Sequence, residues 1–213
     1  MELDVILVVT SLIMLSALLF WQVGFEIPRR ERARMRQIME ALSTAIQLRF
    51  PSHEGLSTRL VSVCRHLAFE LELSPRQIDL IEASALLQDI GLCAVPYAMI
   101  NKKPMMMWTE TENATYARYP EVSAAMLELV PSLSHIAPII RESLADYNDE
   151  LSLEARVLRV AHDFVWTESR LGGAIATERL ALGAGTQYDP DIVGAFLGAI
   201  EPSPLPPAIP VRI

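Results

Sequence analysis

The stretch Leu86-Leu87-Gln88-Asp89-Ile90-Gly91 closes an apolar segment near the middle of the chain. The segment opens with Ser74-Pro75, and Ser is a preferred N-cap residue while Pro is preferred at the first helical position. Apolar residues recur between these ends at helical spacing. The sequence therefore predicts a helix that begins after Ser74 and ends at the polar pair Gln88-Asp89.

A second apolar helical face is expected after Gly55. Its members recur at three- and four-residue steps, as on an amphipathic helix: Leu56, Leu60, Val63, Cys64, Leu67 and Leu71. Leu56 is therefore expected to point into the core. His53 lies one turn earlier, and we interpret it as a solvated loop histidine, with a role as a metal ligand as the alternative.

Composition limits the class of protein. The 213 residues suit one domain of ordinary size plus an appendage. The net charge of -8 argues against binding along nucleic acid, which needs a basic surface. Cys64 and Cys93 lie in apolar segments without metal-ligand spacing, so we interpret them as reduced core residues. The run Met105-Met106-Met107-Trp108 is expected to fill a gap in the core, with an adaptable partner surface as the alternative.

The N-terminal segment is typical of a membrane anchor. Residues 5–25 carry no charge and are almost wholly apolar, and about 20 such residues span a bilayer as a helix. A cleaved signal peptide would begin with a basic region, whereas this chain begins Met1-Glu2-Leu3-Asp4. Five arginines follow the apolar segment, at positions 29, 30, 32, 34 and 36. The positive-inside rule then predicts a single-pass membrane protein with its C-terminal domain in the cytoplasm.

Several segments in the same order resemble the HD-GYP branch of the HD phosphohydrolases. The opening stretch is similar to the family's apolar helix that ends in His-Asp-Ile-Gly-Lys. Gly55-Leu56-Ser57-Thr58-Arg59-Leu60-Val61 resembles its Gly-His-Ser-x-Arg-Val segment, and Gly185-Thr186-Gln187-Tyr188-Asp189-Pro190 resembles its closing Gly-Thr-x-Phe-Asp-Pro. The resemblance covers about residues 40 to 200 and implies an all-α HD-domain helical bundle. Together with the predicted anchor, the expected fold is this bundle preceded by one N-terminal transmembrane helix, held at a bacterial inner membrane.

The resemblance also implies where a metal pair would be held. Such enzymes use the pair to clamp phosphate oxygens and to activate a bound water. The family's ligand positions fall on Leu56, Gln88, Asp89, Tyr119, Ser143, Leu144 and His162, and its phosphate-facing Lys falls on Leu92. Only Asp89 and His162 have side chains that suit a metal. The family's Gly-Tyr-Pro loop is missing, because residues 146–150 lead directly into the next helical segment.

These departures predict a vestigial pocket without a confident catalytic residue. Its expected members are Leu56, Gln88, Asp89, Tyr119, Ser143 and His162. We expect Asp89 and His162 to form a hydrogen-bonded or ion-paired couple, and no cofactor. The alternative is a divalent metal such as Mn or Fe at low occupancy, for which this couple supplies weak candidate ligands. The literal dipeptide His162-Asp163 is interpreted as a coincidence, since the family's last ligand Asp falls on His162.

Four regions are expected: an anchor over 1–27, a basic juxtamembrane helix or linker over 28–40, a degenerate HD-GYP-like domain over 41–200 and a proline-rich tail over 201–213. The predicted function is a signalling or scaffolding module that works through protein contacts, with a homodimer left open. The alternatives are a residual metal-dependent cyclic di-GMP phosphodiesterase and a nucleotide sensor that does not hydrolyse its ligand.

Overall fold

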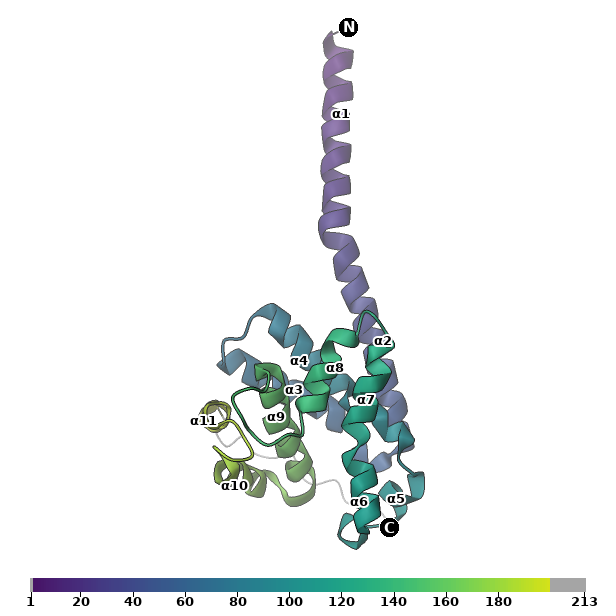
Figure 1. Cartoon of the computed structure of the whole chain (residues 1–213). Helices are drawn as coiled ribbons and strands as arrows, with labels where there is room; N and C mark the ends of the chain where they lie inside the picture. Colours follow the sequence, from purple (N-terminus) through teal and green to yellow (C-terminus); the bar gives the residue numbers. More distant parts are fainter. Residues whose placement is uncertain (1, 200–213) are drawn as a thin grey trace. The chain divides into compact units, whose positions relative to one another are not determined.

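The computed structural model describes residues 2–199, with side chains described from Ile6 onward. The expected proline-rich tail lies outside the described residues. Within this range every regular element is a helix, apart from an isolated bridge between Ala184 and Tyr188 (Figure 1). The all-α prediction is therefore confirmed.

The chain divides into two compact units, Met1–Leu42 and Ser43–Ile213. The first holds α1 (Glu2–Trp21), a π-helical turn (Gln22–Glu26) and the beginning of α2 (Ile27–Arg49). Its apolar segment reaches a mean hydropathy of 2.2, and none of that window is buried within the protein. By length and composition, this helix is able to cross a membrane.

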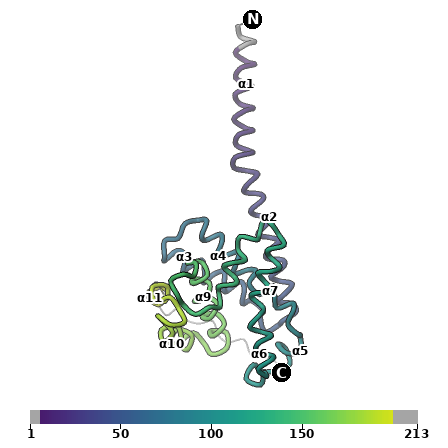
Figure 2. The backbone as a smooth tube through the Cα atoms, in the orientation of Figure 1, coloured from purple at the N-terminus to yellow at the C-terminus, as the bar shows by residue number. Residues whose placement is uncertain are grey.

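The second unit is built on three mutually packed helices: α3 (Leu56–Glu70), α4 (Pro75–Leu87) and α9 (Leu153–Leu171). On one side, α10 (Gly173–Gly183) and α11 (Pro190–Ala199) pack on α9 and on each other (Figure 2). On another, α7 (Tyr119–Glu128) packs on α8 (Ala137–Glu142) and on the 3-10 helix η3 (Gln88–Ala94). The shorter elements are η2 (Pro51–His53), α5 (Tyr97–Lys102), η4 (Met105–Met107), α6 (Glu110–Ala117) and η5 (Ser134–Ile136).

Helix α4 begins where the sequence predicts. Ser74 and Gln77 form a reciprocal capping box, with Pro75 in the first turn. At its C-terminal end α4 tightens after Leu87 into η3, so Gln88 and Asp89 open a 3-10 helix. The predicted helix end is thus confirmed, and the chain that follows it remains helical.

Gly91 lets η3 approach α7 closely. Its backbone N donates to Ser123 Oγ at 2.8 Å, and that hydroxyl can donate its own proton to the carbonyl oxygen of Gln88 or of Tyr119. A Cβ on Gly91 would lie 2.1 Å from the Tyr119 carbonyl oxygen. Only glycine therefore permits this contact between the two helices.

Two expectations about the core are wrong. Cys64 is buried, whereas Cys93 is exposed because η3 turns its side chain outward. Met106 is 93% exposed, and Met105 and Met107 are also exposed, so this run does not fill the core. Only Trp108 is buried there, in a cluster with Phe50, Leu92, Val95, Met99 and Tyr119.

Candidate functional site

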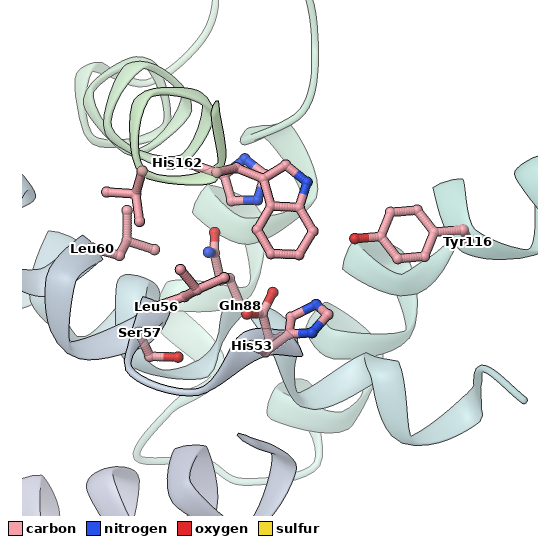
Figure 3. A pocket seen from close by; sticks show the side chains of 10 residues that line it. His53, Leu56, Ser57, Leu60, Gln88, Tyr116 and His162 are labelled. Atoms are coloured by element: carbon pink, nitrogen blue, oxygen red, sulfur yellow. The ribbon is translucent and has the colours of Figure 1, made fainter. Parts of the chain in front are cut away.

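A small cavity lies where η2, α3, η3, α6 and α9 meet (Figure 3). Its volume is about 10 Å³, roughly the space of a single water molecule. Polar and apolar side chains both line it: His53, Leu56, Ser57, Leu60, Gln88, Asp89, Tyr116, His162, Val165 and Trp166. The cavity therefore brings together residues from distant parts of the sequence but leaves little room between them.

Four of the residues expected in the pocket line this cavity: Leu56, Gln88, Asp89 and His162. Tyr119 lies instead in the core cluster, where its ring is 5.2 Å from that of Tyr116. Ser143 is buried at the end of α8, where its hydroxyl donates to the Ile140 carbonyl at 2.8 Å. The side chains of Tyr119 and Ser143 therefore pack within the helical bundle and do not line the cavity.

Two further positions of the family pattern hold apolar side chains that pack in the core. Leu92, on which the resemblance places the family's Lys, is fully buried in the core cluster. Leu144, on which the resemblance places a ligand His, packs against the same cluster. Neither side chain offers a charge or a lone pair to a phosphate or a metal.

His162 pairs with its neighbour in sequence. Its Nδ1 lies 3.0 Å from Oδ1 of Asp163, and Oδ2 of Asp163 accepts from the Tyr188 hydroxyl at 2.9 Å. Burial opposes ionisation of Asp163, but the hydrogen bond from His162 and the charges of His162 and Arg159 lower its pKa overall. In the described part of the chain no hydrogen bond joins Asp89 to His162, so the expected couple is replaced by His162 with Asp163.

Asp89 is the carboxylate that faces the cavity. Burial raises the pKa of Asp89, and the charge of His162 offsets this only in part. Tyr116 turns its hydroxyl toward the same group of side chains (Figure 3). Burial, followed by the charge of Asp89, also raises the pKa of Tyr116, so the phenol stays neutral near neutral pH.

His53 is buried, with 3% of its surface exposed, and the expectation of a solvated loop histidine is wrong. Its ring lies against Phe50 and Trp166, with centroids 5.8 and 4.7 Å away. Burial, followed by repulsion from Arg170 and His162, lowers the pKa of His53 to about 4. Nδ1 lies 3.1 Å from Ser52 Oγ, while Nε2 has no hydrogen-bond partner among the described residues.

The family assignment follows from comparison with known families. The sequence model of the HD domain matches residues 40–192. This chain belongs to the HD domain family. A search of curated proteins found no match. The HD domain has a phosphohydrolase-like fold. In this chain η3, which follows α4, places Asp89 at the cavity, and α9 places His162 there.

The donors present in this HD domain do not fit a metal pair. Such a centre needs several imidazole and carboxylate ligands that converge, with open positions for substrate. His53, Asp89 and His162 line the cavity, but His162 Nδ1 is held by Asp163. Among the described residues, no group of three or more His, Cys, Asp or Glu side chains is placed to hold a metal ion. The described side chains that line the cavity therefore do not form such a metal-binding group.

Tyr116 and Trp166 were not predicted from the sequence, although they complete the cavity wall of the HD domain. Trp166 follows His162 by one helical turn on α9, and Tyr116 precedes Tyr119 by three residues. Residues three or four apart share a helix face. This spacing is a signal that would have placed Trp166 beside His162, whereas Tyr116 and Tyr119 lie on successive helices, α6 and α7.

Proposed function

We propose that this chain is a degenerate member of the HD-GYP branch that works as a membrane-anchored signalling or scaffolding module through protein contacts. The observation that carries this proposal is the filled cavity. A space of about 10 Å³ holds about one water, whereas a dinucleotide needs a pocket of several hundred Å³. The side chains of Leu56 and Trp166 are among those that close the space.

The residues at the family's ligand positions support the same proposal. Leu56 and Leu144 cannot coordinate a metal, and Tyr119 and Ser143 are engaged in the bundle away from the cavity. A hydrolase of this family would also need a charge beside the phosphate, where this chain has buried Leu92. The fold is kept while the hydrolytic groups are replaced, which is the pattern expected of a binding module.

The N-terminal helix supports an anchored location. Its exposed apolar surface is suited to lipid, and the arginines of the first turns of α2 follow it directly. By the positive-inside rule this order favours a domain on the cytoplasmic face of a bacterial inner membrane. The proposal therefore places its protein contacts at that surface.

Turnover of cyclic di-GMP tests the proposal directly. The full chain, purified in a neutral detergent and supplied with Mn or Fe, is expected to show no turnover above a protein-free control. Asp89→Ala and Asp79→Ala, an exposed carboxylate on α4, are expected to give the same result. Metal-dependent turnover that is lost in Asp89→Ala and kept in Asp79→Ala would establish the phosphodiesterase alternative.

Complementation in cells tests the scaffolding part. A strain that lacks the chain is expected to be restored equally by the natural sequence and by Asp89→Ala, because the proposed activity depends on the folded surface. Equal membrane levels of both proteins, measured by immunoblot, are the control. Failure of Asp89→Ala at equal levels would contradict a purely structural role for the HD domain.

A further inference from the structure

A larger pocket lies on the other side of His53, Tyr116 and Trp166. These three residues line both spaces, and they separate the small cavity from an outer pocket of about 340 Å³. The remaining wall comes from Ser52 on η2, from the segment between Ile100 and Trp108, and from Arg170 at the end of α9. A volume of this size lies within the range of small-molecule sites. The volume of the small cavity, about 10 Å³, is far below this range.

The walls of the outer pocket suit a flat apolar ring. Trp108, Tyr116 and Trp166 contribute aromatic side chains, and the Trp108 and Tyr116 rings lie with centroids 5.1 Å apart. The indole Nε1 of Trp108 already donates to the carbonyls of Met99 and Lys103. The polar atom of this residue is therefore satisfied within the protein, and its ring supplies an apolar wall to the pocket.

Arg170 supplies an unneutralised cation. Its guanidinium lies 4.2 Å from the centroid of the Trp166 ring, and Nη1 lies 2.8 Å from the sulfur of Met105. No carboxylate forms an ion pair with Arg170 in the described part of the chain. Lys103 also lines the pocket, but its ammonium is paired with Glu112 at 2.5 Å. Arg170 is therefore the group in this wall that favours an anion.

His53 supplies a buried hydrogen-bonding atom without a partner. Its Nε2 is unsatisfied among the described residues, although the side chain is almost wholly buried and lines the outer pocket. Buried polar atoms are normally hydrogen-bonded, because an unsatisfied one costs free energy. His53 therefore contributes a buried, unsatisfied atom to the wall that the two spaces share.

We propose that the outer pocket binds a small planar aromatic anion, a fused or single ring that carries one carboxylate or phosphate group. The ring lies against Trp166 and Tyr116, and the anionic group pairs with Arg170. This inference goes beyond the proposed scaffolding role, since it gives the module a small-molecule site. It does not involve the positions of the lost metal ligands.

Calorimetric titration with 2-naphthoate and its neutral analogue 2-naphthamide tests the inference on the full chain in neutral detergent. We expect one 2-naphthoate to bind per chain with Kd on the order of 0.1 mM, and the amide to bind roughly tenfold more weakly. Arg170→Gln removes the charge and keeps a polar, though shorter, side chain. It is expected to weaken naphthoate binding roughly tenfold and to leave the amide unchanged.

Arg76→Gln is the matched control, because Arg76 is an exposed arginine on α4 that does not line the outer pocket. It is expected to leave both titrations unchanged, and titration into detergent alone corrects for uptake by micelles. Flat heats for naphthoate would overturn the inference. Binding that Arg170→Gln and Arg76→Gln alter equally would also overturn it, because the anion would then not be recognised by this pocket.

Discussion

Gly91→Ala is expected to lower the free energy of unfolding of the HD domain by about 3 kcal/mol, the upper part of the range for overpacked sites. A Cβ at this position would lie 2.1 Å from the Tyr119 carbonyl oxygen and 2.7 Å from the Ser123 backbone N. Both are backbone atoms, so η3 and α7 must separate. The separation also breaks the hydrogen bond from Gly91 N to Ser123 Oγ. Urea denaturation of the full chain in detergent measures the loss.

Gly194→Ala is the matched control for this substitution. Gly194 lies in α11, and a Cβ there would meet no atom within 4 Å. Replacing glycine inside a helix by alanine stabilises a protein by about 0.5–1 kcal/mol when no contact intervenes. The two variants are therefore expected to change stability in opposite directions. Equal changes would contradict the close approach of η3 to α7.

His53 is expected to make the HD domain less stable in acid. Its pKa is lowered from 6.5 to about 4 in the folded protein, so between these values the unfolded chain binds more protons than the folded one. Stability therefore rises with pH through this window and is lost as pH falls. For His53 alone the loss between about pH 7 and pH 5 amounts to about 2 kcal/mol.

His53→Phe isolates this contribution, because phenylalanine keeps an aromatic ring between Phe50 and Trp166 and cannot be protonated. Asp89 acts in the opposite direction, since its raised pKa makes the folded state bind protons more readily than the unfolded chain. The measurement is accordingly the difference in unfolding free energy between the natural chain and His53→Phe at each pH. A difference that does not change with pH would show that His53 is not held neutral by burial.

The sequence predicts those helix ends that depend on interactions between residues close together in the chain. The predicted N-cap at Ser74, with Pro75 in the first turn, is present because it depends on residues within a single turn. The exposure of Cys93 was not predicted, because an apolar segment was taken as a core segment. Cys93 faces outward because of the orientation of η3, and that orientation is set by the tertiary contact between Gly91 and α7.

The candidate site was predictable only in part, because the family resemblance places some of its residues and the others depend on tertiary contacts. The family resemblance placed Leu56, Gln88, Asp89 and His162 at one cavity because these residues lie at corresponding positions of a shared fold. Adjacent residues on a helix do not usually face each other, so spacing gave no reason to expect the contact of His162 with Asp163. The burial of His53 depends on its tertiary contact with Trp166, which lies more than a hundred residues away in the sequence.

The central proposal is that this HD domain lacks the metal centre on which hydrolysis would depend, and metal content tests this proposal most directly. The full chain and its Asp89→Ala variant are each incubated with excess Mn and Fe, and gel filtration then removes the unbound metal. Elemental analysis measures the metal that stays bound to each protein. The account predicts less than about 0.1 ion per chain in both proteins, because the converging ligands are missing. About two ions per chain in the natural sequence, lost in Asp89→Ala, would contradict it.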